Sequence, residues 1–189
     1  MNVVYSVGHS TRSIVHFNRI LEKYGIKTLV DIRAIPRSRR NPQFSQDRLS
    51  ASLREVGIIY EYLPELGGLR KPRKDSINFG WHNESFRGYA DYIQSQEFEK
   101  GLQRLADLIA SRVVSIMCAE AVPWRCHRSL LGDALVVRGI EVIDILDEMH
   151  SRRHVLTSWA KVDGLQITYP RQDATLASRY EVESHTGGA

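Results

Sequence analysis

Short apolar runs alternate with longer amphipathic stretches along most of the chain. Runs of strand length occupy residues 3–7, 28–35, 58–63, 113–117 and 142–146. Between them, apolar side chains recur at helical spacing, as at Ile14, Phe17 and Leu21, and helices are predicted to end near Gly25, Gly57, Ser111 and Gly139. Strands that alternate with helices predict an α/β fold, a three-layer Rossmann-like open sheet of about five mainly parallel strands.

One domain accounts for most of the chain. The length of 189 residues is enough for a single hydrophobic core, which we expect at residues 1–170. A hairpin is possible near Gly164, and Ser10 or Thr11 is a credible N-cap for the first helix. Residues 171–189 are polar and end in Gly-Gly-Ala, so we expect a flexible tail there.

Composition narrows the class of protein but says little about its partners. Hydrophobic residues make up 42% and charged residues 25%, as in ordinary globular proteins, and no run approaches the roughly twenty apolar residues of a membrane span. The N-terminus lacks a signal-peptide pattern and the chain has two cysteines, which favours a cytoplasmic location with free thiols. The formal net charge is only +4.

The basic residues are unevenly placed along the chain. Two segments concentrate them, one with Arg33, Arg37, Arg39 and Arg40 and the other with Arg70, Lys71, Arg73 and Lys74. These segments could hold a nucleic-acid backbone, with Phe44, Phe79, Trp81 and His82 as stacking partners for bases. A solvated surface is the commoner reason for such runs, so both interpretations stay open.

The segment 113–128 concentrates polar chemistry at a junction between two apolar elements. A predicted strand is followed by a loop with Pro123 and by the start of a helix, and the junction carries Cys118, Glu120, Arg125, Cys126, His127 and Arg128. Ligands of open parallel sheets bind at the carboxyl ends of the strands, where the strand order reverses. With the order 3-2-1-4-5, His9 and Ser10 would face this junction, and Asp31 and Arg33 would leave the sheet beside it.

Cys118 is the best candidate for a catalytic nucleophile. Cations and helix N-termini stabilise thiolates, and His9 or Glu120 could move protons. The alternative is that Cys118 is a small apolar side chain packed at the end of a strand. The spacing of a phosphatase loop is absent, since Cys118 and Arg125 are seven positions apart with no glycine between them.

Anion binding is the most economical interpretation of the junction. Free N–H groups at a helix N-terminus favour negative charge, and arginines can bind phosphate in a bidentate manner. The candidate substrate-binding residues are Ser10, Arg33, Arg125, His127 and Arg128. The alternative is a structural network in which these arginines pair with Glu120, Asp31 or Asp133. We expect Asp31 to neutralise Arg33.

A metal site is a further alternative. Cys118, Glu120, Cys126, His127 and His9 are competent ligand types, but the C-x7-C-H spacing matches no common zinc motif. We therefore expect Cys126 to be a buried supporting residue and assign no metal ligand. Dinucleotide-binding and Walker A signatures are also absent, so no cofactor is indicated.

Five segments in this order give the chain a resemblance to the DUF488 family of uncharacterised proteins. They are Ser6–Ser10, Val30–Pro36, Leu66–Gly68, Phe86–Asp91 and the block from Cys118-Ala-Glu120 to Cys126-His127-Arg128. The resemblance implies a small cytoplasmic protein and supports the location of the site, but it supplies neither substrate nor reaction.

Two functions remain in competition. The leading hypothesis is an enzyme that acts on an anionic, phosphate-bearing substrate, a nucleotide or a nucleic acid, at the Cys/His/Arg site. The alternatives are a non-catalytic nucleic-acid-binding module, in which the basic loops matter more than Cys118, and a zinc-binding protein. None of them involves a membrane.

Overall fold

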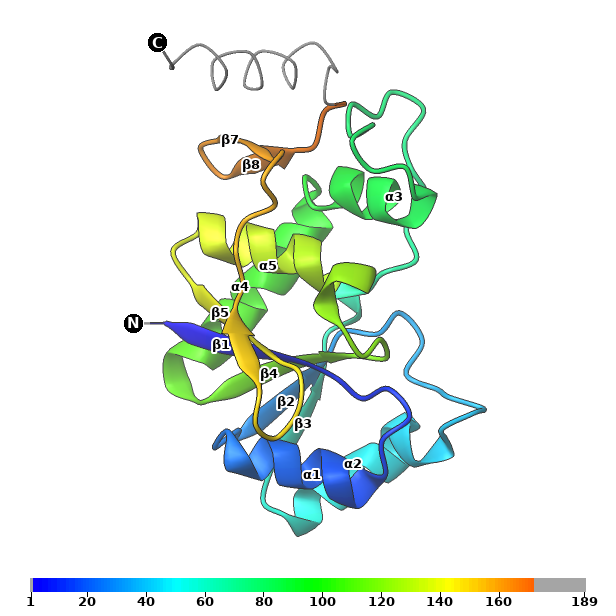
Figure 1. The fold of residues 1–189 in the computed structure, drawn as a ribbon, viewed down its shortest axis with the longest axis vertical. Helices are drawn as coiled ribbons and strands as arrows, with labels where there is room; N and C mark the ends of the chain where they lie inside the picture. The colour runs from blue at the N-terminus through cyan, green and yellow to red at the C-terminus, as the bar shows by residue number, and fades with distance from the viewer. Residues whose placement is uncertain (1, 172–189) are drawn as a thin grey trace, which may run out of the picture.

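The computed structural model describes residues 2–171, so most of the predicted tail at 171–189 lies outside the described residues. A mixed sheet of six strands forms its centre (Figure 1). The strands are β1 (Val3–Gly8), β2 (Thr28–Asp31), β3 (Ile59–Tyr62), β4 (Val114–Cys118), β5 (Glu141–Ile145) and β6 (Ser151–Arg153). β1 to β5 run parallel and β6 is antiparallel to β5, which confirms the predicted open, mainly parallel sheet.

The strand order is β3-β2-β4-β1-β5-β6, so the expected order 3-2-1-4-5 was wrong. β4 lies between β2 and β1, because the connection from β1 to β2 skips one strand position. β4 is buried along its whole length, as suits a central strand. The expected contact between the ends of β1 and β4 is nevertheless present, because the two strands are neighbours in either order.

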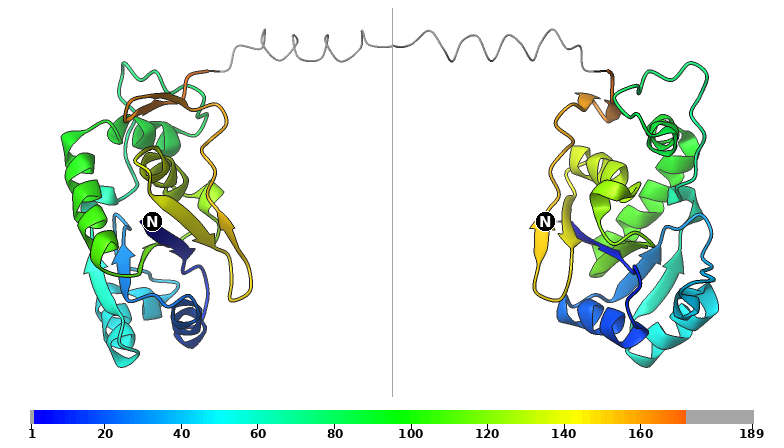
Figure 2. Two further views of the ribbon diagram at one scale, coloured as in Figure 1. Left: turned by 90° about the vertical axis from the view of Figure 1, so that its left-hand side faces the viewer. Right: turned by 45° about the vertical axis from the view of Figure 1, so that its right-hand side comes forward.

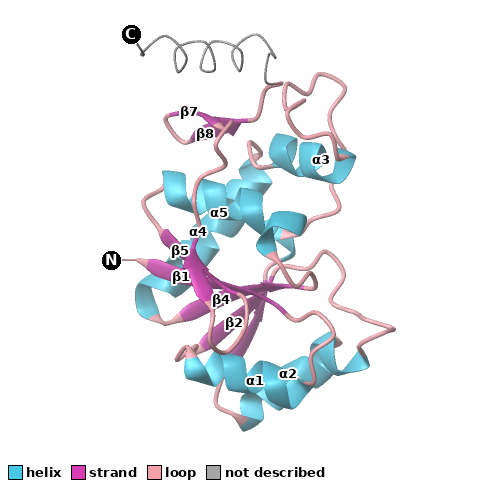
Figure 3. Cartoon of the chain, in the orientation of Figure 1, coloured by secondary structure: helices cyan, strands magenta, loops and turns pink. Residues whose placement is uncertain are grey.

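Helices cover both faces of the sheet, as the three-layer prediction requires (Figure 3). α1 (Ile14–Lys23) and α2 (Gln46–Glu55) lie on one face, and α3 (Glu84–Tyr92), α4 (Gln96–Ser111) and α5 (Arg128–Val137) lie on the other. Each face has its own cluster of buried apolar side chains. Burial of these two clusters from water is the main force that holds the layers together.

The helix ends show which local signals operate. Gly25, Gly57 and Gly139 adopt left-handed backbone angles just beyond α1, α2 and α5, as glycine commonly does there. Ser13, rather than the expected Ser10 or Thr11, caps α1 by accepting a hydrogen bond from the His16 amide. The helix predicted to end near Ser111 is α4, and it begins at Gln96 because Ser95 caps it and separates it from α3.

The last described segment folds back over the helices of one face (Figure 2). β7 (Lys161–Asp163) and β8 (Gln166–Thr168) form the hairpin expected near Gly164. Gln94 donates a hydrogen bond of 2.6 Å to the Ile167 carbonyl, which fastens the hairpin to the domain. Within the described residues, no helix combines the length and the apolar character needed to cross a membrane.

Candidate functional site

The corners that follow β1 and β4 meet directly. Gly8 pairs with Cys118 in the sheet, and the His9 and Ser10 amides donate to the Cys118 and Ala119 carbonyls at 3.0 and 2.9 Å. A Cβ atom at Gly8 would lie 1.8 Å from the Glu120 carbonyl oxygen, so only glycine permits this approach. The structure therefore brings together the two segments that sequence analysis placed in one site.

A cleft of about 840 Å³ opens above these corners. Its lining includes Ser10, Cys118, Cys126 and His127, together with five arginines, namely Arg33, Arg37, Arg39, Arg40 and Arg125. Glu120 is the one carboxylate among the lining residues. Glu120 and Arg125 are both exposed, so they border the cleft on its solvent side. The balance of charge along the cleft wall favours an anionic ligand.

Arg33 is held in place by a buried carboxylate. Asp31 is fully buried, and both of its oxygens accept hydrogen bonds from the Arg33 guanidinium, the shortest at 2.6 Å. The Tyr60 hydroxyl donates to the same carboxylate at 2.7 Å. These bonds raise the pKa of Arg33 against the opposing effect of burial. As expected, Asp31 neutralises Arg33, and it also fixes the direction in which the guanidinium faces the cleft.

His9 supports Arg33 from the other side. Its Nδ1 lies 2.8 Å from the Ser10 carbonyl, and its Nε2 lies 3.3 Å from Arg33 Nη1. Burial lowers the pKa of His9 to about 4, so the ring is neutral near pH 7 and can accept from Arg33 through Nε2. The ring also stacks on Phe44, which is fully buried. The expectation that Phe44 could stack on bases was therefore wrong, because His9 and the core occupy it.

Arg128 is a buried cation without a carboxylate partner among the described residues. It is 1% exposed, and it donates to Ser6 Oγ at 3.1 Å and to the Glu120 carbonyl at 2.5 Å. Asp133, an expected partner, instead accepts from His154 and from the Tyr169 hydroxyl. The structural network proposed for the arginines therefore holds for Arg33 but does not supply Arg128 with an anion.

Both cysteines lie beside one imidazole ring on the floor of the cleft. His127 Nδ1 is 3.5 Å from Cys126 Sγ and 4.0 Å from Cys118 Sγ. A hydrogen bond from Cys118 lowers the pKa of Cys126, aided by His127 and Arg128, and the same bond, together with burial, raises the pKa of Cys118. Both sulfur atoms therefore lie beside the same ring, whereas the sequence had suggested Cys118 as the reactive sulfur and Cys126 as a supporting residue.

The two basic segments have different positions. Arg37, Arg39 and Arg40 line the mouth of the cleft. The second segment does not line it: the Arg70 guanidinium lies 3.7 Å from the centre of the Tyr92 ring, and Arg73 pairs with Asp75 at 2.7 Å. Sequence analysis treated both segments alike, because charge density along a chain does not reveal which loop reaches the sheet edge.

Comparison with known proteins yields one match. A family model described as a domain of unknown function, DUF488, matches residues 13–135, about two thirds of the chain. The chain belongs to the DUF488 family. The matched residues include Asp31, Arg33 and the whole block from Cys118 to Arg128, while Gly8, His9 and Ser10 precede them. No curated protein and no solved structure matches the chain.

Side chains of α3 hold the long loop at 67–83 in place through hydrogen bonds. The Asp91 carboxylate accepts from Ser76 Oγ, Asn78 Nδ2 and the Arg73 amide, all within 2.8 Å. The Tyr89 hydroxyl donates to the Leu66 carbonyl at 2.8 Å. These contacts explain why the segment Phe86–Asp91 accompanies the site, since they hold the loop that supplies the cleft with Gly68 and with Leu69, which sequence analysis missed.

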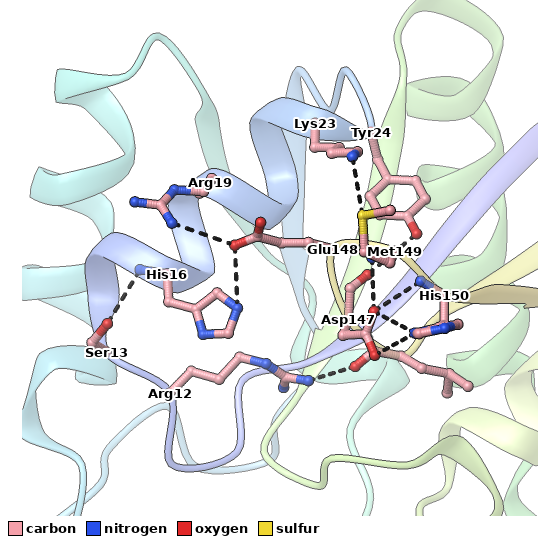
Figure 4. Close-up of polar contacts among 11 residues, drawn as sticks. Arg12, Ser13, His16, Arg19, Lys23, Tyr24, Asp147, Glu148, Met149 and His150 are labelled. Atoms are coloured by element: carbon pink, nitrogen blue, oxygen red, sulfur yellow. Dashed lines mark hydrogen bonds and ion pairs between the residues drawn. The ribbon is translucent and has the colours of Figure 1, made fainter.

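Arg12 connects the end of β1 to the segment after β5 through hydrogen bonds. Its guanidinium donates to the carbonyls of Gly8 and of Leu146, the latter at 2.6 Å. Figure 4 shows the contacts between α1 and the loop after β5, where Glu148 lies 3.3 Å from the His16 ring. The corner that carries His9 is therefore tied to the carboxyl end of β5 as well as to β4.

Proposed function

We propose that this DUF488 protein is an enzyme that acts on an anionic, phosphate-bearing substrate, a nucleotide or a nucleic acid, bound in the cleft above β1 and β4. The observation that carries the proposal is the composition of that cleft, where five arginines and one carboxylate surround a cysteine–histidine cluster. Planar guanidinium groups match phosphate oxygens in geometry as well as in charge. The volume of about 840 Å³ falls within the usual range for small-molecule sites.

The arginines differ in the work each can do. Arg33 is pre-oriented by Asp31 and His9, so it loses little conformational freedom when it binds a phosphate. Arg37, Arg39, Arg40 and Arg125 are exposed and can attract and then contact the rest of the anion. The chemistry belongs to Cys118, Cys126 and His127, which line the floor of the same cleft.

Phosphate binding can be tested without knowing the reaction. Arg125→Gln removes an exposed cation of the cleft, whereas Arg73→Gln removes an exposed arginine that lies outside it. We expect Arg125→Gln to weaken binding of inorganic phosphate and of a nucleoside monophosphate about tenfold in isothermal titration, the effect of losing one charge-assisted hydrogen bond. Arg73→Gln should bind as the unaltered protein does. Equal affinity of the two variants would contradict the proposal.

The second candidate is a non-catalytic nucleic-acid-binding module, and the position of Arg37, Arg39 and Arg40 at the cleft mouth favours it. Cys118→Ser separates the two functions. An enzyme that uses the cluster loses turnover in this variant, while a binding module retains its affinity for a short oligonucleotide. Replacing the three arginines by glutamine should weaken oligonucleotide binding in either case and should reduce its dependence on salt.

A further inference from the structure

Three potential metal ligands converge on the floor of the cleft. Cys118 ends β4, while Cys126 and His127 immediately precede α5, and their donor atoms all lie within 4.8 Å of one another. Cys118 and Cys126 are 8% and 3% exposed, and both are free thiols. The cluster is thus shielded from bulk water but still borders the cleft.

The distances within the cluster suit a tetrahedral centre. Zinc binds thiolate sulfur at about 2.3 Å and imidazole nitrogen at about 2.0 Å, which places sulfur and nitrogen ligands roughly 3.6 Å apart. Nδ1 of His127 lies 3.5 Å from one sulfur and 4.0 Å from the other. Both nitrogen–sulfur distances therefore lie within about half an ångström of the separation that a bound zinc ion requires.

We propose that Cys118, Cys126 and His127 bind a zinc-like divalent metal ion, with the fourth coordination position open to the cleft. Three protein ligands and one open position are the usual composition of a catalytic zinc site. The inference deepens the proposed function, since it states what the cluster on the cleft floor holds, and metal binding itself can be tested without a substrate.

The surroundings support this assignment. The hydrogen bonds of the His127 ring within the described residues are made through Nδ1, the nitrogen that faces both sulfur atoms. A Cβ atom at Gly68 would lie 2.8 Å from His127 Nδ1, and glycine there leaves the metal-facing nitrogen uncovered.

The charges balance when the metal binds. Two thiolates neutralise a divalent ion, and the thiol protons are released to solvent as two metal–sulfur bonds and one metal–nitrogen bond form. The open position can then accept a phosphate oxygen or a water molecule. The arginines that line the cleft would hold the rest of the anion. The adjacent ligands Cys126 and His127 also explain why no common spacing pattern exposed the site in the sequence.

Cobalt(II) gives a direct test, because thiolate coordination produces charge-transfer absorption in the near ultraviolet that other ligands do not. Metal-free full-length protein, kept reduced, is titrated with Co²⁺ and then with Zn²⁺ in competition with a chromophoric chelator. We expect one metal per chain with the thiolate band. Cys118→Ser, Cys126→Ser and His127→Gln should each weaken zinc binding about 100-fold or more. His150→Gln, which alters an exposed histidine outside the cleft, should bind as the unaltered protein does.

Circular dichroism of each variant separates loss of ligand from loss of fold. Absence of the thiolate band, or unchanged zinc affinity in a folded Cys126→Ser variant, would overturn the metal site. Phosphate binding measured on the same metal-free protein keeps the two proposals distinct. If phosphate binds but no metal does, only the metal site fails. If metal binds but Arg125→Gln leaves phosphate affinity unchanged, the proposed function fails instead.

Discussion

The buried pair of Asp31 and Arg33 concentrates several strong interactions on two side chains. Asp31 is fully buried, Arg33 is 5% exposed, and Tyr60 adds a hydrogen bond to the carboxylate. A buried ion pair gains little net stability from its charges alone, because both ions lose water. Its value here is geometric, since it fixes one guanidinium at the cleft wall.

Tyr60→Phe tests how much one hydrogen bond to the Asp31 carboxylate contributes to the stability of the folded chain. The variant removes a 2.7 Å hydrogen bond to a buried carboxylate, and we expect the free energy of unfolding in urea to fall by about 1.5 to 3 kcal/mol. Tyr62→Phe is the matched control, because its hydroxyl donates to a neutral carbonyl at 3.3 Å, and it should cost about 1 kcal/mol or less. Equal losses of unfolding free energy in the two variants would show that the hydrogen bond from Tyr60 to the charged carboxylate is no stronger than one to a neutral carbonyl.

Sequence reasoning at this scale succeeded where residues are close along the chain. Asp31 and Arg33 are two positions apart at the end of a strand, so alternation of side chains places them on one face, and their pairing was predicted. The partners of Arg128 could not be predicted in this way, since Ser6 and Glu120 come from other elements. The relation between the two thiols was also beyond the sequence, because it depends on where His127 points.

The loop at 67–83 shows how one helix controls the edge of the cleft. Asp91 on α3 accepts three hydrogen bonds from the loop, including one from Asn78, which is 2% exposed. The loop has few apolar anchors along this stretch, so its order depends largely on these bonds. The carboxyl end of the loop also receives a bond from outside, because the Tyr169 amide donates to Asn78.

Asp91→Ala should loosen this loop while the sheet stays folded. Loss of the carboxylate leaves Ser76 Oγ and the Asn78 amide without their acceptor, so we expect faster hydrogen–deuterium exchange across residues 73–79 and weaker phosphate binding. Asp75→Ala is the matched control, because Asp75 is exposed and contacts only the Arg73 side chain among the described residues. Faster exchange spread evenly over β1 and β4 would contradict a local role for Asp91.

At the scale of elements, hydrophobic periodicity predicted which segments become strands and helices, but it could not give their order in space. The five parallel strands were found because each is a short apolar run bounded by turn residues. β6 was missed, since Ser-Arg-Arg is polar and exposed and lacks the apolar run of the other strands. β4 lies between β2 and β1 because the connection from β1 to β2 skips one strand position. No local sequence pattern indicates which connection does so.

His154 connects three parts of the molecule through one buried charge. It follows β6, and its ring lies 2.9 Å from Asp133 on α5 and 3.5 Å from Asp144 on β5. Burial opposes the charge on the ring, but the hydrogen bonds and ion pairs with the two carboxylates outweigh it and raise the pKa of His154 to about 9. The ring is therefore protonated at neutral pH and holds the segment after β5 against the domain.

The stability of the whole domain should consequently depend on pH above neutrality. Because the pKa of His154 is higher in the folded chain than the ordinary value of 6.5, its contribution is fully present below about pH 6.5 and is lost as the pH rises through 9. We expect the free energy of unfolding in urea to fall by roughly 2 to 3 kcal/mol between pH 6.5 and pH 9.5.

His154→Gln should be less stable at pH 6.5 and should lack most of this decline. His82→Gln, which alters an exposed histidine, should retain it. An equal decline in the His154→Gln variant would assign the pH dependence to other groups and would leave the Asp133–His154–Asp144 contacts without a role in holding the domain closed.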